Sequence, residues 1–207
     1  MSPGPIRASP GVILFDMDGT ITRPLLDFDA IRRDLKTQGP ILEAIGQFEG
    51  ERLSEANAIL DRHERLAAEK SELSDGCVEL MGWLSQHSYR TALITRNSRN
   101  STGIILEKHG LCFDLVLTRD DGPTKPYPQP LLRTIHALGC ERHEAWMVGD
   151  GSHDIEAATA AGVHSVWISH RSLRTFDAVP GTTIDALEEL LPMLAAIRDS
   201  PGMASRV

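Results

Sequence analysis

The sequence predicts a doubly wound α/β fold, in which helices cover both faces of a parallel sheet and a small all-helical segment follows the first strand. Short apolar runs recur along the chain and are nearly continuous, as is typical of strands that are buried on both faces. Helical patterns separate these runs, which favours right-handed crossover connections. The predicted strands are residues 12–15, 91–94, 114–117, 145–148 and 163–168.

Four helices are predicted between and after these strands. Glycines at 110, 139 and 162 follow the first three and are natural stops, because glycine readily adopts the left-handed conformation of a helix end. Pro128 stands at a helix start, where proline is tolerated, whereas Pro192 is expected to interrupt the closing helix. The predicted helices are residues 98–109, 128–138, 154–161 and 184–197.

The segment between about residues 27 and 73 carries no strand pattern. Two short helices are expected around 31–35 and 41–45, separated by Gly39 and Pro40. The chain is therefore divided into a core, residues 1–22 and 74–207, and a helical cap, residues 23–73. A longer cap helix is predicted from apolar positions at three- and four-residue steps, namely Leu53, Ala56, Leu60, His63 and Ala67.

Composition excludes some classes of protein. The chain has 207 residues and a formal net charge of −8, which argues against nucleic-acid binding because a phosphate backbone requires a basic patch. No apolar run approaches the roughly 20 residues of a membrane span, and no signal-peptide pattern opens the chain. Cys77, Cys112 and Cys140 are widely spaced and are expected to be reduced thiols. We therefore expect a cytoplasmic protein; its oligomeric state cannot be predicted, and both chain ends, residues 1–10 and 200–207, are expected to fray.

Asp16 and Asp18 end the first predicted strand. Residues i and i+2 of an extended chain point the same way, so both carboxylates face one site at the sheet edge where ligands bind. Two carboxylates this close repel each other unless a cation neutralises them or one holds a proton. Both conditions suit phosphoryl transfer, in which one carboxylate attacks phosphorus and the other protonates the leaving oxygen. Taken alone, the segment is also compatible with a solvated turn.

Three later segments end the next strands with chemistry-bearing residues. Thr95 and Arg96 lie where a hydroxyl and the N–H groups of a following helix can cradle phosphate. Lys125 lies between prolines on a stiff loop, which suits a fixed positive charge. Asp150, flanked by glycines, is a good ligand for a hard cation. Taken alone, the Thr95 segment favours a helix cap and Lys125 an exposed loop lysine.

Together and in this order, the four segments resemble the motif series of the haloacid dehalogenase-like superfamily of phosphohydrolases. The series is Asp-x-Asp-Gly-Thr from Asp16, a strand-terminal Thr95, Lys125-Pro126, and Gly-Asp-x-x-x-Asp ending at Asp154. The resemblance covers roughly residues 11–22 and 74–169 and implies a Rossmann-like core. The proline-rich loop and the helical insert look most like the phosphoglycolate phosphatase-type branch.

The resemblance implies a magnesium-dependent phosphatase acting on a small phosphorylated metabolite. Asp16 would be the nucleophile that forms an aspartyl-phosphate, and Asp18 the general acid and then the base. Thr95, Arg96 and Lys125 would bind the phosphoryl group. Asp16, the backbone carbonyl of Asp18, and Asp150 would hold Mg²⁺, with Asp154 as a ligand through water or a support behind the metal.

Other functions remain open at this point. Dehalogenation is disfavoured because that chemistry does not use Asp18, and a phosphonatase would need a cap lysine, for which only Lys36 and Lys70 are available. A receiver-like signalling module phosphorylated on Asp carries similar residues, although there the phosphorylated Asp follows a later strand. A catalytically silent relative that only binds phosphorylated ligands is a further alternative. Phosphoglycolate is a first guess for the substrate.

The loop into the cap departs from the family pattern. Residues 22–24 read Thr-Arg-Pro where many relatives have an acidic and a small residue, which puts substrate specificity in doubt. Arg32, Arg33 and Lys36 could contact an anionic substrate, but a solvated helix face is the favoured interpretation. His153 is likewise expected to have no special role.

Overall fold

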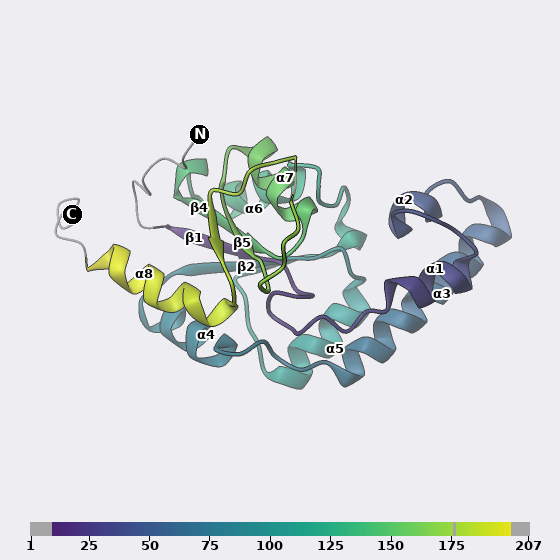
Figure 1. Ribbon diagram of the computed structural model, residues 1–207, viewed down its shortest axis with the longest axis horizontal. Helices are drawn as coiled ribbons and strands as arrows, with labels where there is room; N and C mark the ends of the chain where they lie inside the picture. The colour runs from purple at the N-terminus through teal and green to yellow at the C-terminus, as the bar shows by residue number, and fades with distance from the viewer. Residues whose placement is uncertain (1–9, 176, 200–207) are drawn as a thin grey trace.

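Residues 10–175 and 177–199 are described by the computed structural model of this chain, so the predicted frayed ends lie outside them except for Pro10. They form one six-stranded sheet, entirely parallel, in the order β3-β2-β1-β4-β5-β6 (Figure 1). The predicted doubly wound α/β fold is confirmed. The strands are β1 (Val12–Phe15), β2 (Arg90–Ile94), β3 (Leu115–Leu117), β4 (Ala145–Gly149), β5 (His164–Ile168) and β6 (Thr182–Ile184).

Alternate side chains of each strand enter different cores, because successive residues point to opposite faces of a sheet. Ile13 and Phe15 pack with α4 (Cys77–Gln86), α5 (Arg99–His109) and α8 (Leu190–Arg198). Val12 and Leu14 pack with α6 (Gln129–Ala137) and α7 (Ser152–Ala161) on the other face. All four side chains of β1 are fully buried, which explains their unbroken apolar pattern.

Three helices lie between β1 and α4, and Figure 1 shows them to one side of the sheet. They enclose an apolar cluster of their own that includes Ile31, Ile41 and Leu60. The longest helix also packs along α5 of the core. The three are α1 (Phe28–Leu35), α2 (Ile41–Ile45) and α3 (Gly50–Lys70), and we call them the cap helices.

The prediction for the end of the chain is partly wrong. Residues 182–184 form strand β6 at the sheet edge, whereas a helix was expected to begin at Ile184. Residues 182–184 read Thr-Thr-Ile, which is too short and too polar to be recognised as a buried apolar strand. Pro192 does not interrupt α8, because it lies in the first helical turn, where no backbone N–H is required. Helix α4 and the 3₁₀ turns (Arg119–Asp121, Arg142–Glu144 and Leu187–Glu189) were not predicted.

The buried face of α3 also differs from the predicted one. Ala56 and Leu60 are buried as expected, but the face continues through Glu64 and Ala68 instead of His63 and Ala67. A carboxylate inside this face is unexpected from hydropathy alone. Within residues 10–175 and 177–199, no helix combines the length and hydropathy needed to cross a membrane.

Candidate active site

The predicted site residues lie where the order of the strands reverses. The chain passes from β1 to β2 and β3 on one side, then returns to β4, which pairs with the other side of β1. In open α/β sheets the ligand site lies at this point, outside the carboxyl ends of the strands. Asp16 follows β1, Thr95 follows β2 and Asp150 follows β4. The fold thus brings Asp16 and Asp150 to the same edge of the sheet, although they are 134 positions apart in the sequence.

Lys125 links two of the carboxylates. Its Nζ lies 2.5 Å from Oδ1 of Asp16 and 2.7 Å from Oδ1 of Asp154, and the lysine side chain is 2% exposed. The other oxygen of Asp154 accepts a hydrogen bond of 3.0 Å from the backbone N–H of Gly151 at the start of α7. Asp154 therefore holds Lys125 in place from behind, and Lys125 holds the Asp16 carboxylate.

The site carries more negative than positive charge. Burial raises the pKa of Asp16 well above its usual value, and the charges of Asp154 and Asp150 add to this effect against the opposing charge of Lys125. Burial, followed by the charge of Asp154, raises the pKa of Asp150 to about 6. Burial disfavours the Lys125 ammonium, but Asp154 and Asp16 more than offset this and raise its pKa. One lysine leaves three carboxylates incompletely neutralised.

This donor set fits a hard divalent cation. Asp16, Asp150 and Asp154 each present an oxygen, and the three oxygens lie within 4.8 Å of one another. Hard cations such as Mg²⁺ take carboxylate oxygens, and a second positive charge would relieve the repulsion described above. Asp154, which was expected behind the metal or bound through water, lies near enough to be a direct ligand. The Asp18 side chain is not part of this cluster, and the role of its backbone carbonyl as a metal ligand stays a prediction.

Asp18 faces a different partner. Nδ2 of Asn97 donates a hydrogen bond of 2.6 Å to Oδ2 of Asp18, and the Asn97 N–H donates to Oγ1 of Thr95 at 3.1 Å. Burial raises the pKa of Asp18 to about 6; the hydrogen bond from Asn97 lowers it and the nearby charge of Glu64 raises it. Near neutral pH this carboxyl is therefore far more often protonated than an exposed aspartate. Such a group is suited to both donating and accepting a proton.

Arg96 bridges the core and the cap helices. Its Nη2 donates to Oε1 of Glu43 in α2 at 2.7 Å, and its Nη1 donates to Nε2 of His153 at 2.7 Å. Burial, followed by the charge of Arg96, lowers the pKa of His153, so its ring remains the neutral acceptor. The predicted phosphate-binding role of Arg96 thus competes with an existing ion pair, and His153 has a contact that the sequence did not indicate.

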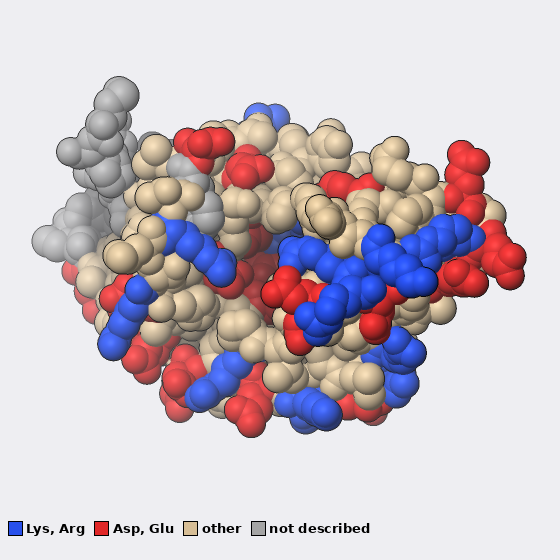
Figure 2. Space-filling model, turned by 45° about the vertical axis from the view of Figure 1, so that its right-hand side comes forward, with Lys and Arg blue, Asp and Glu red and all other residues tan. Residues whose placement is uncertain are grey.

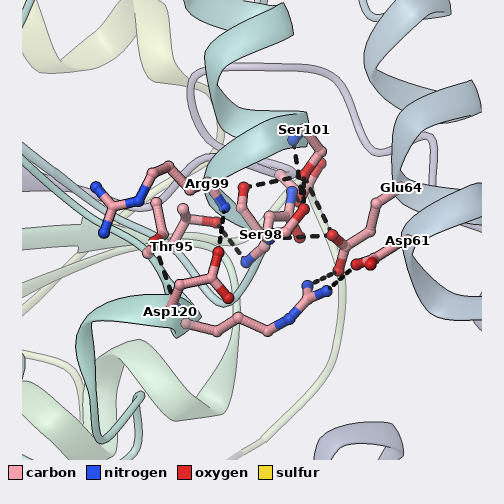
Figure 3. Close-up of polar contacts among 11 residues, drawn as sticks. Asp61, Glu64, Thr95, Ser98, Arg99, Ser101 and Asp120 are labelled. Carbon is pink, nitrogen blue, oxygen red and sulfur yellow. Dashed lines mark hydrogen bonds and ion pairs between the residues drawn. The ribbon is translucent and has the colours of Figure 1, made fainter. Parts of the chain in front are cut away.

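Glu64, like His153, has contacts near the site that the sequence did not predict. Its Oε2 accepts hydrogen bonds from the N–H of Ser98 at 3.0 Å and Oγ of Ser101 at 3.1 Å, at the first turn of α5 (Figure 3). Its other oxygen pairs with Arg119, which also contacts Asp61 of α3 at 2.5 Å. The N-terminus of a helix favours a negative charge, so this carboxylate joins the longest cap helix to the core. Its only sequence signal is a four-residue step from Leu60.

Backbone atoms of the site are held by two further side chains. Nε1 of Trp167 donates to the carbonyl of Asp150 at 3.0 Å, and Nε2 of His170 lies 2.7 Å from the carbonyl of Gly19. Both residues belong to β5 or the loop directly after it, so the neighbouring strand fixes the two acidic loops. Neither residue stands within a motif, so the sequence offered no signal for them.

We expect Gly19→Ala to weaken Mg²⁺ binding at the candidate metal site specifically. Gly19 has a φ of +76°, and a Cβ at this position would collide with the Asp150 carboxylate. Gly39 provides a matched control, because it has a φ of +79° and no atom within 4 Å of its would-be Cβ. Both variants should lose about 1–2 kcal/mol of stability from backbone strain. Only Gly19→Ala should also require a higher Mg²⁺ concentration for half-maximal activity, and equal Mg²⁺ requirements would contradict this explanation.

The site opens into a cavity of about 390 Å³ between the core and the cap helices. Figure 2 shows acidic side chains deep in a hollow of this face, with basic side chains over the adjoining cap helices. Arg32, but neither Arg33 nor Lys36, lines the cavity; all three border a separate surface hollow. The predicted site residues that line the cavity are Asp16, Asp18, Thr95, Arg96, Lys125, Asp150 and Asp154, which is the complete predicted set.

Fold and site together define a class of protein: a doubly wound α/β enzyme with an acidic site beneath a helical segment. Residues 35–168, more than half of the chain, match the family model described as haloacid dehalogenase-like hydrolase. The chain belongs to the haloacid dehalogenase-like hydrolases, which confirms the predicted resemblance. Membership in a family of hydrolases also separates it from the receiver-like signalling modules that the sequence left open.

Named relatives agree with this assignment. The chain is 29% identical to pyrophosphatase PpaX of Halalkalibacterium halodurans over 207 aligned residues, which cover 88% of this chain and 95% of that protein. It is 31% identical to the phosphoglycolate phosphatase of Nitrosococcus oceani over 134 residues, 62% of this chain and 60% of that protein. The crystal structure of a HAD phosphatase from Thermococcus onnurineus superposes with a TM-score of 0.67 at 27% identity, covering 88% of this chain and 97% of the other.

Proposed function

We propose that this chain is a magnesium-dependent phosphatase that hydrolyses a small phosphate monoester through an aspartyl-phosphate on Asp16. One observation carries the proposal: the Asp16 carboxylate is clamped by Lys125 beside two further carboxylates, with the protonatable Asp18 two residues away. The names of the relatives, a pyrophosphatase and a phosphoglycolate phosphatase, support a reaction at phosphorus. The division into core and cap and the cytoplasmic location stay predictions.

In the first half of the reaction, an oxygen of Asp16 attacks phosphorus and the bond from phosphorus to the ester oxygen breaks. Asp18 gives its proton to that oxygen, which leaves as an alcohol. The ammonium of Lys125, which already contacts Asp16, neutralises charge on the transferring phosphoryl group, and the hydroxyl of Thr95 binds one of its oxygens. Charge in phosphoryl transfer is spread over these oxygens, so electrostatic positioning supplies most of the rate.

In the second half, the ionised Asp18 takes a proton from water and the resulting hydroxide attacks phosphorus. The bond between phosphorus and Asp16 breaks, which returns the free carboxylate and releases inorganic phosphate. Asn97 holds Asp18 in position for both steps, because its amide donates to the Asp18 oxygen. Asp16, Asp150 and Asp154, together with the Asp18 carbonyl, would hold Mg²⁺. When bound, Mg²⁺ lowers the repulsion between Asp16 and an anionic substrate.

The two roles of Asp18 can be separated with p-nitrophenyl phosphate, whose leaving group departs without a proton. Asp18→Asn should release up to one equivalent of p-nitrophenol in a rapid burst and then stall, because no base activates water for the second step. Stopped-flow absorbance with Mg²⁺ measures the burst. Steady turnover at the wild-type rate would overturn the assignment of Asp18, and absence of release by the wild-type protein would indicate a relative that only binds its ligand.

A further inference from the structure

The cavity above Asp16 has two chemically different halves. The core half carries Asp16, Asp18, Lys125 and Thr95, which would hold the phosphoryl group in the proposed reaction. The half formed by the cap helices and the loop before them receives the rest of the substrate, and its wall is predominantly apolar. Its side chains include Leu25, Leu26, Phe28, Ile31, Ile41 and Leu42.

Three charged groups near this outer half already have partners within the protein. Arg32 donates to Asp29 at 2.8 Å and to the carbonyl of Gly39 at 2.9 Å. Arg96 is held by Glu43 and His153, and Glu64 by Arg119 and two groups at the start of α5. A carboxylate or second phosphate that approached Arg32 or Arg96 would have to displace one of these partners. Arg174 also lines the cavity and makes no ion pair within residues 10–175 and 177–199, but it is exposed, and an ion pair with an exposed group contributes little.

Two large apolar side chains of this wall face solvent as well. Phe28 is 52% exposed and Leu25 is 46% exposed. Exposed apolar groups that adjoin a site gain stability when a ligand covers them. A cavity of about 150 Å³ can hold benzene, so 390 Å³ accommodates a phosphoryl group with an apolar group of that size beside it.

We propose that the substrate is the phosphate monoester of an apolar alcohol, whose hydrocarbon part packs against the apolar wall of Leu25, Leu26, Phe28, Ile31, Ile41 and Leu42. This rests on the proposed phosphatase function and specifies its substrate class. It sets this chain apart from an enzyme for phosphoglycolate, whose leaving group carries a carboxylate. Sugar phosphates, with hydroxyl groups that need hydrogen-bond partners, are equally ill matched to an apolar wall.

Straight-chain alkyl phosphates test the proposal directly, because their leaving groups differ in length and hardly in acidity. We expect kcat/KM for Mg²⁺-dependent phosphate release to rise roughly threefold for each methylene from ethyl to butyl to hexyl phosphate. Ethyl phosphate and 2-phosphoglycolate share a two-carbon skeleton. The carboxylate of the latter should lower kcat/KM at least about tenfold.

Two matched variants test whether the apolar wall causes the preference for longer alkyl chains. Phe28→Ser removes an exposed side chain of the wall without opening the core, and should lower the hexyl-to-ethyl ratio of kcat/KM at least about threefold. Leu66→Ser changes an exposed apolar residue of α3 that does not line the cavity and should leave the ratio unchanged. An unchanged ratio in Phe28→Ser would overturn the assignment of selectivity to this wall.

The remaining outcomes separate this inference from the proposed function. Equal kcat/KM along the alkyl series, or faster hydrolysis of 2-phosphoglycolate than of hexyl phosphate, overturns the apolar substrate class while phosphate release upholds the phosphatase. If neither these compounds nor p-nitrophenyl phosphate release phosphate with Mg²⁺, the phosphatase function fails, and the substrate class fails with it.

Discussion

Asp16→Asn is expected to abolish phosphate release, lowering kcat at least about 10⁴-fold, because an amide cannot form the acyl-phosphate bond. Burial and the charges of the neighbouring carboxylates raise the pKa of Asp16, so a negative charge at this position costs free energy in the folded protein. The neutral amide should therefore leave thermal stability unchanged or raise it. The measurement is Mg²⁺-dependent phosphate release together with a thermal unfolding curve. Loss of activity in a protein that remains fully folded is the expected pair of results.

Asp75→Asn is a suitable control for this experiment. Asp75 pairs with Arg23 at 2.7 Å on the surface, and both side chains are more than half exposed. The substitution is the same, but it lies outside the cavity, so kcat should change less than about twofold. Full activity in Asp16→Asn would show that a different group attacks phosphorus. A burst of product from Asp16→Asn equal to that of Asp18→Asn would contradict the order of the two roles.

Glu64→Ala is expected to cause the largest loss of stability, about 3 kcal/mol or more. The Glu64 side chain is 2% exposed and that of Arg119 is 12% exposed, so the substitution leaves a largely buried guanidinium with only the exposed carboxylate of Asp61 as a partner. It also leaves the N–H of Ser98 unpaired at the start of α5. Glu64→Gln keeps a hydrogen-bond acceptor and should lose less. Urea unfolding monitored by circular dichroism measures all three proteins.

A control on the same helix separates burial from charge. Glu69 forms an ion pair of 2.8 Å with Arg65, and both side chains are nearly half exposed. Glu69→Ala should lose only a few tenths of a kcal/mol, because exposed pairs at this spacing contribute little. If Glu64→Ala is no less stable than Glu69→Ala, the network in Figure 3 does not hold the long cap helix to the core.

The pattern of the sequence predicted the core sheet and the gathering of the site because both depend on local rules. Strands of a parallel sheet that are buried on both faces are rich in apolar residues; β1 and β4 have an unbroken run, and β5 ends in one, Val166 to Ile168. Strand ends of a parallel sheet meet at one edge, so polar residues after each strand converge. Strand β6 was not predicted, because it is short and lies at the edge of the sheet, where few apolar residues are required.

Residues that act through partners were not predictable in the same way. Asn97 was not among the predicted site residues, yet its side chain bonds Asp18, 79 positions earlier in the chain. Glu64 resembles any surface glutamate until α3 is placed against α5. Arg96 looked available for phosphate, but Glu43 of the cap helices already occupies its guanidinium. Each of these contacts joins segments whose relative position no local pattern encodes.

The sequence by itself therefore determined the fold class, the order of the motifs and the polar residues at the strand ends that line the core side of the cavity. These follow from side-chain type, from strand periodicity and from the common edge at which parallel strands end. Only the tertiary structure decided which charges are already paired, that an oxygen of Asp154 lies close to those of Asp16 and Asp150, and that the outer wall of the cavity is apolar. Those properties depend on distances of a few ångströms between distant segments, and such distances are set by packing.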